Sequence, residues 1–283
     1  MLTASLVIYK NSLNQVTTLL DCINRAECVR KLYIIDNYST DEIKQFFEIK
    51  TKNCVWNFDI EYIPHENTGY GSSHNIALKK AIEFGSDYHV VLNPDIEFDS
   101  NVLKSLMNYM NENSDVVYVL PKVIYPNGEL QYLCKLLPTP ADLILRRFLP
   151  KISLIKKMDE RYSLMDSGYN KIMNPPCLSG CFMFLRVRTL CENNLFFDER
   201  YFMYLEDFDF MRRLHRVGKT VYYPKVTIIH NHAKESYKSV KMLKIHIQSA
   251  IKYFNKFGWF FDKERKIMNK QILKEINIMN QEK

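Results

Sequence analysis

Two groups of carboxylates in this sequence could do chemistry. The first is Asp95, in the stretch LNPDIEF, directly after the apolar run 88–92. An ordinary Asn-Pro-Asp turn would also explain it, because Asn-Pro starts turns and aspartate tolerates their geometry. A carboxylate at the exposed end of a buried strand can also hold a hard divalent cation, with an imidazole as a further ligand.

The second group lies in YLEDFDFMRRL, where Glu206, Asp207 and Asp209 fall within four residues. On a helix, Asp209 and Arg213 are four residues apart and can pair, so Asp207 points elsewhere. Acids in a first helical turn suit the helix dipole, which would account for two of the three. A carboxylate among aromatic residues tends to have a perturbed protonation equilibrium, which makes Asp207 a candidate base.

Two histidines, His230 and His232, alternate along the chain after the apolar residues 227–229. A lone histidine at a strand end is more often structural than a ligand. Here an ion held by Asp95 would accept one imidazole, so metal binding and a structural role both remain open.

Strand and helix patterns alternate in the first part of the chain. We expect strands at 6–9, 31–35, 60–63, 88–92 and 178–185 and helices at 12–25 and 74–84. Such alternation with short connections predicts an α/β fold with a parallel sheet covered by helices. The ligand site should lie at the carboxyl ends of the strands, where the polar clusters fall.

The glycines Gly69 and Gly71 lie two residues apart in the loop NTGYGSSHN, which opens a predicted helix. Such a loop offers backbone N–H groups and a helix N-terminus to a phosphate. A plain turn would explain the same spacing.

Composition limits the possible classes of protein. The chain has 283 residues, 47% of them hydrophobic, so it can bury a substantial core and is not disordered. The seven cysteines have no paired CxxC spacing and predict buried thiols rather than zinc. The net charge of +7 permits nucleic acid, anionic lipid or a phosphorylated substrate. The first residues do not resemble a signal peptide, and no apolar run approaches the ~20 residues of a membrane span.

Two later segments are basic. Residues 135–175 are punctuated by proline and predict a mobile excursion over the site, with its basic part at 146–157. Residues 238–283 combine lysines with Trp259, Phe260 and Phe261. This pattern fits a helix packed on the core, or an interfacial helix whose aromatic residues enter the headgroup region while lysines meet anionic lipid.

The order and spacing of several motifs resemble family 2 glycosyltransferases, most closely the bacterial rhamnosyltransferases that build O-antigen and capsule chains. The motifs are VIYK, DNYSTD, NTGYGSSHN, LNPD, LSGCFMFLR, YFMYLEDFDFMRRL and IIH, and the resemblance covers about residues 4–235. It implies a GT-A fold, Rossmann-like with a mixed, mostly parallel sheet. Residues 1–98 would form the nucleotide-binding half, 99–235 the acceptor-binding half, and 236–283 a C-terminal basic amphipathic helical region.

The resemblance also implies roles for individual residues. On the donor side, Ile8 and Tyr9 would line the nucleoside pocket, Asp36 would contact the base or ribose, and the residues near the nucleotide would be Asn67, Gly69, Gly71 and Asn93. Asp95 and His230 would bind Mg²⁺ or Mn²⁺. Asp207 would be the base, and the acceptor would be contacted by Glu206, Tyr204 and Gly180. One departure is Asn93, which replaces the first aspartate of the DxD motif. An amide is a neutral and weaker ligand, so the ion would arrive mainly with the donor diphosphate.

The expected reaction is an inverting transfer, with L-rhamnose from dTDP-L-rhamnose preferred by resemblance over UDP-hexose or UDP-N-acetylhexosamine donors. The expected acceptor is a polyprenyl-diphosphate-linked saccharide at the inner membrane face, reached by a cytoplasmic, peripherally bound enzyme that binds no nucleic acid. A sugar-phosphate nucleotidyltransferase and a non-catalytic saccharide-binding protein are the alternatives. The first should carry a glycine-rich basic loop at the first strand, and VIYKNSLNQ has no glycine.

Overall fold

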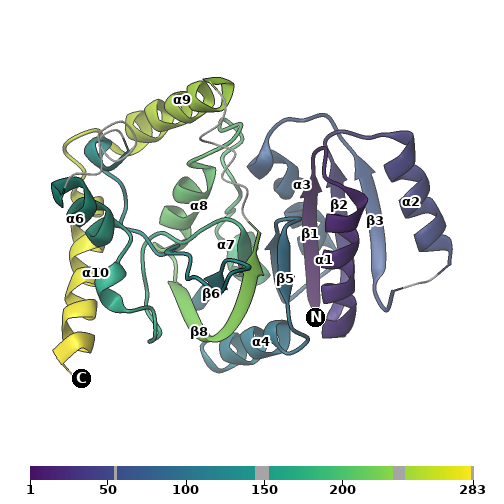
Figure 1. Ribbon diagram of the computed structural model, residues 1–283, viewed down its shortest axis with the longest axis horizontal. Helices are drawn as coiled ribbons and strands as arrows, with labels where there is room; N and C mark the ends of the chain where they lie inside the picture. Colours follow the sequence, from purple (N-terminus) through teal and green to yellow (C-terminus); the bar gives the residue numbers. More distant parts are fainter. Residues whose placement is uncertain (54–55, 144–152, 232–239, 282–283) are drawn as a thin grey trace.

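The fold was analysed in a computed structural model that describes residues 1–53, 56–143, 153–231 and 240–281 (Figure 1). A single eight-stranded sheet runs through it. In sheet order the strands are β3 (Asp59–Pro64), β2 (Val29–Asp36), β1 (Leu2–Ile8), β4 (Tyr88–Leu92), β7 (Phe182–Arg186), β6 (Val116–Ile124), β8 (Lys219–His230) and β5 (Ile96–Phe98).

The described helices cover this sheet or extend beyond it. They are α1 (Leu13–Ala26), α2 (Asp41–Lys52), α3 (Tyr70–Glu83), α4 (Val102–Glu112), α6 (Ser153–Tyr162), the 3₁₀ helix η1 (Met165–Ser167), α7 (Val187–Glu192), α8 (Glu206–Leu214), α9 (Val240–Phe257) and α10 (Lys263–Gln281). The predicted alternation of strands and helices and the predicted mixed sheet are therefore confirmed, and helices form the end of the chain as expected.

The strands β1 to β4 are mutually parallel. Side chains alternate along β1, with Leu6 and Ile8 in the core on the α1 side and Ser5 bonded to His74 of α3 at 2.8 Å. The strand begins at Leu2 rather than residue 6, because the polar Thr3 and Ser5 are buried through hydrogen bonds to histidines. The helix α1 starts where a capping box forms between Ser12 and Gln15.

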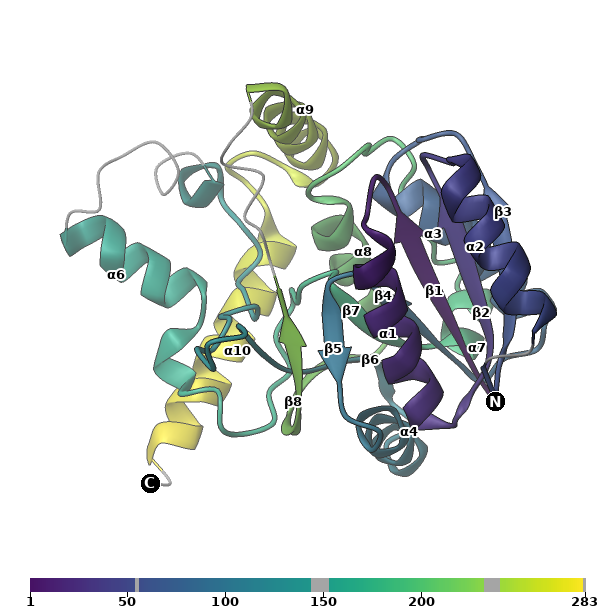
Figure 2. The same ribbon diagram turned by 45° about the vertical axis from the view of Figure 1, so that its right-hand side comes forward.

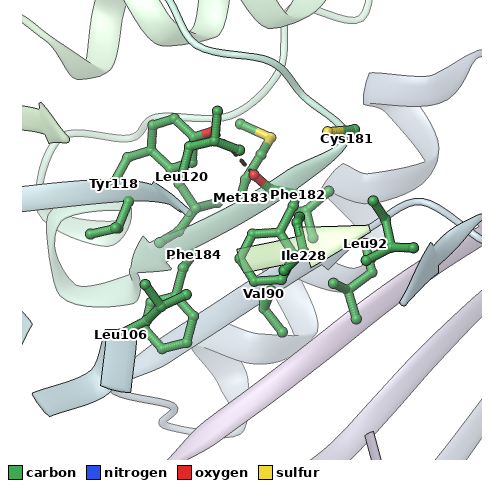
Figure 3. Close-up of a cluster of buried hydrophobic side chains, with 14 of the residues drawn as sticks. Val90, Leu92, Leu106, Tyr118, Leu120, Cys181, Phe182, Met183, Phe184 and Ile228 are labelled. Atoms are coloured by element: carbon green, nitrogen blue, oxygen red, sulfur yellow. Dashed lines mark hydrogen bonds between the residues drawn. The ribbon is translucent and has the colours of Figure 1, made fainter. Parts of the chain in front are cut away.

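The strands β4 and β7 pair antiparallel and join the two halves of the sheet. Apolar side chains from both, with others from β6, β8 and α4, form the core shown in Figure 3; the labelled members are Val90, Leu92, Leu106, Tyr118, Leu120, Cys181, Phe182, Met183, Phe184 and Ile228. The strand β7 is shorter than predicted and starts only at Phe182. The residues before it are bound by tyrosine side chains instead, with Tyr118 donating to the carbonyl of Ser179 at 2.9 Å.

The described parts of 135–175 contain two helical elements that the sequence pattern did not predict. They include α6 and η1, and the hydroxyl of Tyr169 donates to the carbonyls of Cys134 at 2.9 Å and Ser163 at 2.6 Å. The hydroxyl of Tyr222 in β8 donates to the carbonyl of Tyr169 at 3.1 Å and ties the segment to the sheet. Most of the basic part predicted at 146–157 lies outside the described residues.

The C-terminal helices pack on α8 through a buried charge cluster. The guanidinium of Arg212, 1% exposed, donates to both oxygens of Asp262 at 2.7 and 2.6 Å and to Glu264 at 2.7 Å. It also stacks over the ring of Phe257 at 4.2 Å. The helices α9 and α10 are therefore part of the folded unit, and among the described helices none could cross a bilayer, by length and apolarity taken together.

We expect Asp262→Ala to lower the free energy of unfolding by about 3 kcal/mol, because it removes the bidentate partner of a buried arginine. Glu264 remains beside Arg212 and limits the loss. Urea denaturation measures the change. Glu192→Ala removes a partner from the exposed Arg188 and should leave the midpoint nearly unchanged. Equal midpoints for both variants would contradict a structural role of the buried pair.

Candidate active site

The carboxyl ends of β1, β2 and β3 meet in register. Ile8 pairs with Asp36, and Asp36 pairs with Pro64. The carboxylate of Asp36 is fully buried and accepts from the backbone N–H of Tyr38 at 2.9 Å and from the hydroxyl of Tyr62. Asp36 is thus held at the end of β2 by the protein, next to the position expected for a nucleoside.

An exposed aromatic pair stands above these strand ends. The rings of Tyr9 and Tyr38 meet edge to face at 5.7 Å, and the ammonium of Lys10 lies 4.6 Å from the ring of Tyr38. Both rings are nearly half exposed, at 48% and 46%. Sequence reasoning named Tyr9 but missed Tyr38 and Lys10, although Tyr38 lies within the DNYSTD motif. Exposed aromatic faces of this kind suit stacking on a base.

The loop between β3 and α3 touches the segment before α8. Gly69 has φ +111°, and a Cβ there would lie 2.2 Å from the carbonyl oxygen of Phe202. The N–H of Gly69 donates to the side chain of Asn67 at 3.3 Å, and that of Tyr70 donates to Phe202 at 3.0 Å. A Cβ at Gly71 would meet the Cβ of Phe197 at 2.7 Å. Close packing therefore requires both glycines, and two of the N–H groups expected to face a phosphate already have acceptors in the protein.

The pairing of β5 with β8 brings Asp95 and His230 together. His230 is opposite Ile96 in the register, and the N–H of Asn231 donates to the carbonyl of Asp95 at 2.9 Å. The imidazole Nε2 lies 3.4 Å from Oδ1 of Asp95. The other histidine of the predicted pair, His232, lies outside the described residues.

A buried glutamine orients His230. The imidazole Nδ1 lies 3.0 Å from Oε1 of Gln131, and the amide of Gln131 donates to the carbonyl of His230 at 2.7 Å. Sequence reasoning missed Gln131. With Nδ1–H donated to the amide oxygen, Nε2 faces Asp95, the orientation a metal-binding imidazole needs.

These two side chains fit a divalent cation. They supply one carboxylate oxygen and one imidazole nitrogen, and in 1–53, 56–143, 153–231 and 240–281 no cluster of three or more His, Cys, Asp or Glu residues could hold a metal ion. A donor diphosphate and water would complete the shell that Mg²⁺ or Mn²⁺ requires. Burial lowers the pKa of His230, but Cys181 and Asp95 outweigh it and raise the pKa to about 10. An arriving cation would therefore displace a proton from this imidazole.

The three acids of α8 separate as the spacing predicts. The guanidinium of Arg213 donates to Asp209 at 2.6 Å, and Lys256 of α9 pairs with the same carboxylate. Asp207 instead accepts backbone N–H bonds from Phe208 at 2.9 Å and Gly180 at 3.3 Å. Gly180 lies against this carboxylate, since a Cβ there would be 3.1 Å from the Cβ of Asp207.

Glu206 is a buried carboxyl group, and the neighbouring Asp207 is half-buried. Burial and the charge of Asp207 raise the pKa of Glu206 well above its ordinary value, and its Oε2 has no hydrogen-bond partner among the described residues. Burial also raises the pKa of Asp207, while Lys135 and the two backbone N–H groups act in the opposite direction. Sequence reasoning missed Lys135. Two carboxyl groups in different environments can divide acid and base roles.

Aromatic residues near Asp207 divide between the core and the site. Tyr201 is fully buried in a cluster with Leu205, Tyr253 and Phe254, so it is a core residue. Tyr204 is half-buried, has φ +67° and lies 5.3 Å from the ring of His246 on α9. Tyr204 therefore stands between α8 and the C-terminal region.

The sequence model of glycosyl transferase family 2 matches residues 6–207, a span that holds most of β1, the strands β2 to β4, Asp95 and Asp207. The chain belongs to glycosyl transferase family 2. Its activity is glycosyl transfer, so the family favours neither the nucleotidyltransferase nor the non-catalytic alternative. A search of curated protein sequences finds no match to this glycosyltransferase.

Solved structures share its GT-A fold. TarS residues 1–349 from S. aureus is similar with a TM-score of 0.57 and 16% identity, over 98% of this chain and 71% of that one. GalNAc-T7 with UDP, GalNAc and Mn²⁺ is similar with a TM-score of 0.61 and 14% identity, over 88% of this chain and 47% of that one. The mannosyltransferase PcManGT from Pyrobaculum calidifontis, in complex with GDP-Man and Mn²⁺, is similar with a TM-score of 0.59 and 15% identity, over 89% of this chain and 64% of that one.

We expect Glu206→Gln to stabilise this glycosyltransferase increasingly as pH rises from 5 to 8. A free glutamate has a pKa of about 4.3, and burial raises that of Glu206 in the folded state. The stability that the neutral carboxyl contributes is complete below the unfolded pKa and is lost as pH rises through the folded pKa. The wild type should therefore lose stability relative to the variant, by at most about 1.4 kcal/mol per pH unit.

Urea denaturation at pH 5 and pH 8 measures this difference, and Glu192→Gln on the surface of α7 is the matched control. For the control variant, the difference in free energy of unfolding from the wild type should be the same at pH 5 and pH 8. A difference between Glu206→Gln and the wild type that is the same at both pH values would show that Glu206 ionises normally.

Proposed function

We propose that this glycosyltransferase acts by a single inverting displacement with Asp207 as the base. The observation that carries the proposal is that the end of β4 and the start of α8 meet through one short segment. The N–H of Asn93 donates to the carbonyl of Cys181 at 2.9 Å, and the preceding Gly180 donates to Asp207 at 3.3 Å. A base and a leaving-group site must be this near each other to act on one sugar carbon.

In the reaction, Asp207 accepts the proton of an acceptor hydroxyl as that oxygen forms a bond to the anomeric carbon of the donor. The bond between that carbon and the diphosphate oxygen breaks, through an oxocarbenium-like state, and the nucleoside diphosphate leaves with the electron pair. Glu206, neutral because of its raised pKa, can hydrogen-bond the acceptor beside Asp207. Mg²⁺ or Mn²⁺ held by Asp95 and His230 would offset the charge on the leaving diphosphate.

For the donor we propose dTDP-L-rhamnose, on the resemblance of the sequence motifs. A UDP-hexose or UDP-N-acetylhexosamine is the alternative, and it is supported by similar structures that contain UDP and UDP-GlcNAc. Tyr9, Tyr38 and Asp36 would hold the nucleoside of either donor. Calorimetric titration with dTDP, UDP and GDP, with and without Mn²⁺, identifies the nucleotide. Preference for UDP over dTDP would exclude the rhamnose donor.

We expect Asp207→Asn to lower the transfer rate by ~10²–10⁴-fold, because the amide cannot accept a proton. Nucleotide affinity should stay within about threefold, since the donor would contact the ends of β1, β2 and β4. Sugar transfer to a lipid-linked acceptor and calorimetry on one preparation measure both. Asp115→Asn, a surface aspartate paired with Lys219, is the control and should remain active.

If Asp207→Asn transfers sugar at a rate within a few-fold of the wild type, Asp207 is not the base and Glu206 becomes the next candidate. Loss of nucleotide binding together with transfer would show instead that Asp207 holds the donor site together, which would contradict its assignment as base. The unfolding temperature should not fall, because desolvation raises the pKa of Asp207 in the folded state and the substitution removes a charge that folding disfavours.

The proposed acceptor is a polyprenyl-diphosphate-linked saccharide, which would place this enzyme peripherally on the inner face of the cell membrane. Its support is α9, which has no acidic residue and carries Lys241 and Lys244. The other two lysines of this helix bind the protein instead, Lys252 through the carbonyl of Arg200 and Lys256 through Asp198 and Asp209. This helix lies on the side of the molecule to which the carboxyl ends of β1 and β8 point in both views (Figures 1 and 2). Each basic residue near an anionic surface contributes on the order of 1 kcal/mol.

The corner between α9 and α10 presents two aromatic side chains to solvent. Phe260 is 73% and Phe261 94% exposed. The buried Arg265 donates to the carbonyls of Trp259 at 3.3 Å and Phe260 at 3.4 Å. An internally bonded corner therefore displays these rings, which favours insertion between lipid headgroups.

We expect the double variant Phe260→Ser, Phe261→Ser to bind vesicles of anionic phospholipid several-fold more weakly than wild type, because both rings lose their contact with the interface. Co-sedimentation at increasing salt measures binding. Ile49→Ser is the control, since it removes an exposed apolar residue from α2. Truncation after residue 238 is a poor test because it removes Asp262 from Arg212. Binding by the double variant equal to wild type would exclude the corner as a membrane contact.

A further inference from the structure

Tyr70, in the first turn of α3, bridges three segments of the active site. Its hydroxyl donates to the carbonyl of Gly180 at 2.7 Å and lies 3.0 Å from the side-chain amide of Asn93. Its backbone N–H donates to the carbonyl of Phe202 at 3.0 Å. One residue therefore binds the end of β4, the segment before β7 and the segment before α8.

The chemistry of position 93 fits this contact. An asparagine side chain can present its oxygen or, after a half-turn, its NH₂ group to the same hydroxyl, whereas an ionised aspartate only accepts. The hydroxyl of Tyr70 already donates to Gly180 at the shorter distance. With that proton donated to Gly180, Asn93 binds the hydroxyl oxygen by donating from its NH₂ group, which an ionised aspartate cannot do. The amide in place of the first DxD acid then has a function within the protein.

Gly180 connects this contact to the base. Its carbonyl accepts from Tyr70, and its N–H donates to Oδ2 of Asp207 at 3.3 Å. A Cβ at this position would lie 3.1 Å from the Cβ of Asp207, so glycine allows the close approach. Glycine also leaves the backbone free to rotate, and its conformation must be fixed by its neighbours. Tyr118 holds the adjacent carbonyls of Ser179 and Phe182, and Tyr70 holds that of Gly180.

We infer that Tyr70 is a positioning residue that sets the distance between Asp207 and the donor end of β4, with Asn93 as its partner rather than as a metal ligand. The inference rests on the proposed function, because it concerns the same displacement. Removing the hydroxyl frees the carbonyl of Gly180, so rotation about this glycine is less restrained and the position of its N–H against Asp207 is less well defined. A displacement of about 1 Å in an active site can cost ~10²-fold in rate.

The test is Tyr70→Phe, assayed for kcat, donor KM, nucleotide Kd and thermal unfolding. We expect kcat to fall about ten- to a hundredfold. The KM and Kd should stay within about threefold and the unfolding temperature within a few degrees, because Tyr118 still holds the rest of the segment. A residue with a merely structural role would change stability and leave kcat per folded molecule unchanged.

The matched control is Tyr88→Phe. The hydroxyl of Tyr88 donates to Oδ1 of Asn111 at 2.6 Å, which is the same kind of pair at the opposite end of β4. This control should keep its kcat. Asn93→Ala alone, and together with Tyr70→Phe, completes a double-mutant cycle in which the two losses of kcat should not add, because both break one contact.

Three results would overturn the inference. The first is a Tyr70→Phe variant with kcat within twofold of wild type, and the second is losses of kcat in the cycle that add. The third is a nucleotide Kd that rises for Asn93→Ala only when Mn²⁺ is present, and by the same factor whether residue 70 is Tyr or Phe. If the wild type itself transfers no sugar from any donor tested, the proposed function fails and the inference fails with it. An active wild type with an equally active Tyr70→Phe variant contradicts the inference alone.

Discussion

The antiparallel pairing of β4 with β7 is the constraint on which the other features of this site depend. Leu92 is opposite Phe182 in that register, and the next hydrogen bond joins Asn93 to Cys181. The side chains on both strands are packed in the central core, so a slip by one residue would turn each of them to the opposite face. The core therefore determines how near the end of β4 lies to Gly180 and Asp207.

Buried charge is the second feature of this enzyme, and its two uses differ. Arg212 and Asp262 are both buried but paired, so they anchor α8 without leaving a charge unsatisfied. Glu206 at the start of the same helix is buried beside Asp207, with its pKa raised, and destabilises the folded state near neutral pH. The anchor at Arg212 and the bond from Arg213 to the carbonyl of Phe196 at 2.6 Å attach α8 to the rest of the protein and offset that cost. A helix that carries unfavourable acids at its start needs such support.

The loop before α3 and the segment before α8 are joined by contacts that do not involve a ligand. Gly69 packs directly against the carbonyl of Phe202, and the N–H of Tyr70 donates to the same carbonyl. On the other side of α8, Ser249 of α9 donates to the carbonyl of Met203 at 2.8 Å. The segment 201–205 is therefore held between the donor loop and the basic helix α9. A membrane contact on α9 and a nucleotide at the donor loop would act on the same few residues.

The sequence by itself determined the alternation of strands and helices, the placement of polar clusters at strand ends and the pairing of Asp209 with Arg213. These follow from local periods, since apolar spacing reports which face of an element is buried and a four-residue separation places side chains on one helix face. Only the tertiary structure decided that Tyr201 is a core residue, that His230 meets Asp95 beside Gln131, and that Tyr70 contacts Asn93 and Gly180. The residues that meet in these contacts are far apart along the chain. They are brought together by strand register and by the packing of several elements at once. No local pattern of residues reports that, because the same spacing of side chains is compatible with many long-range registers.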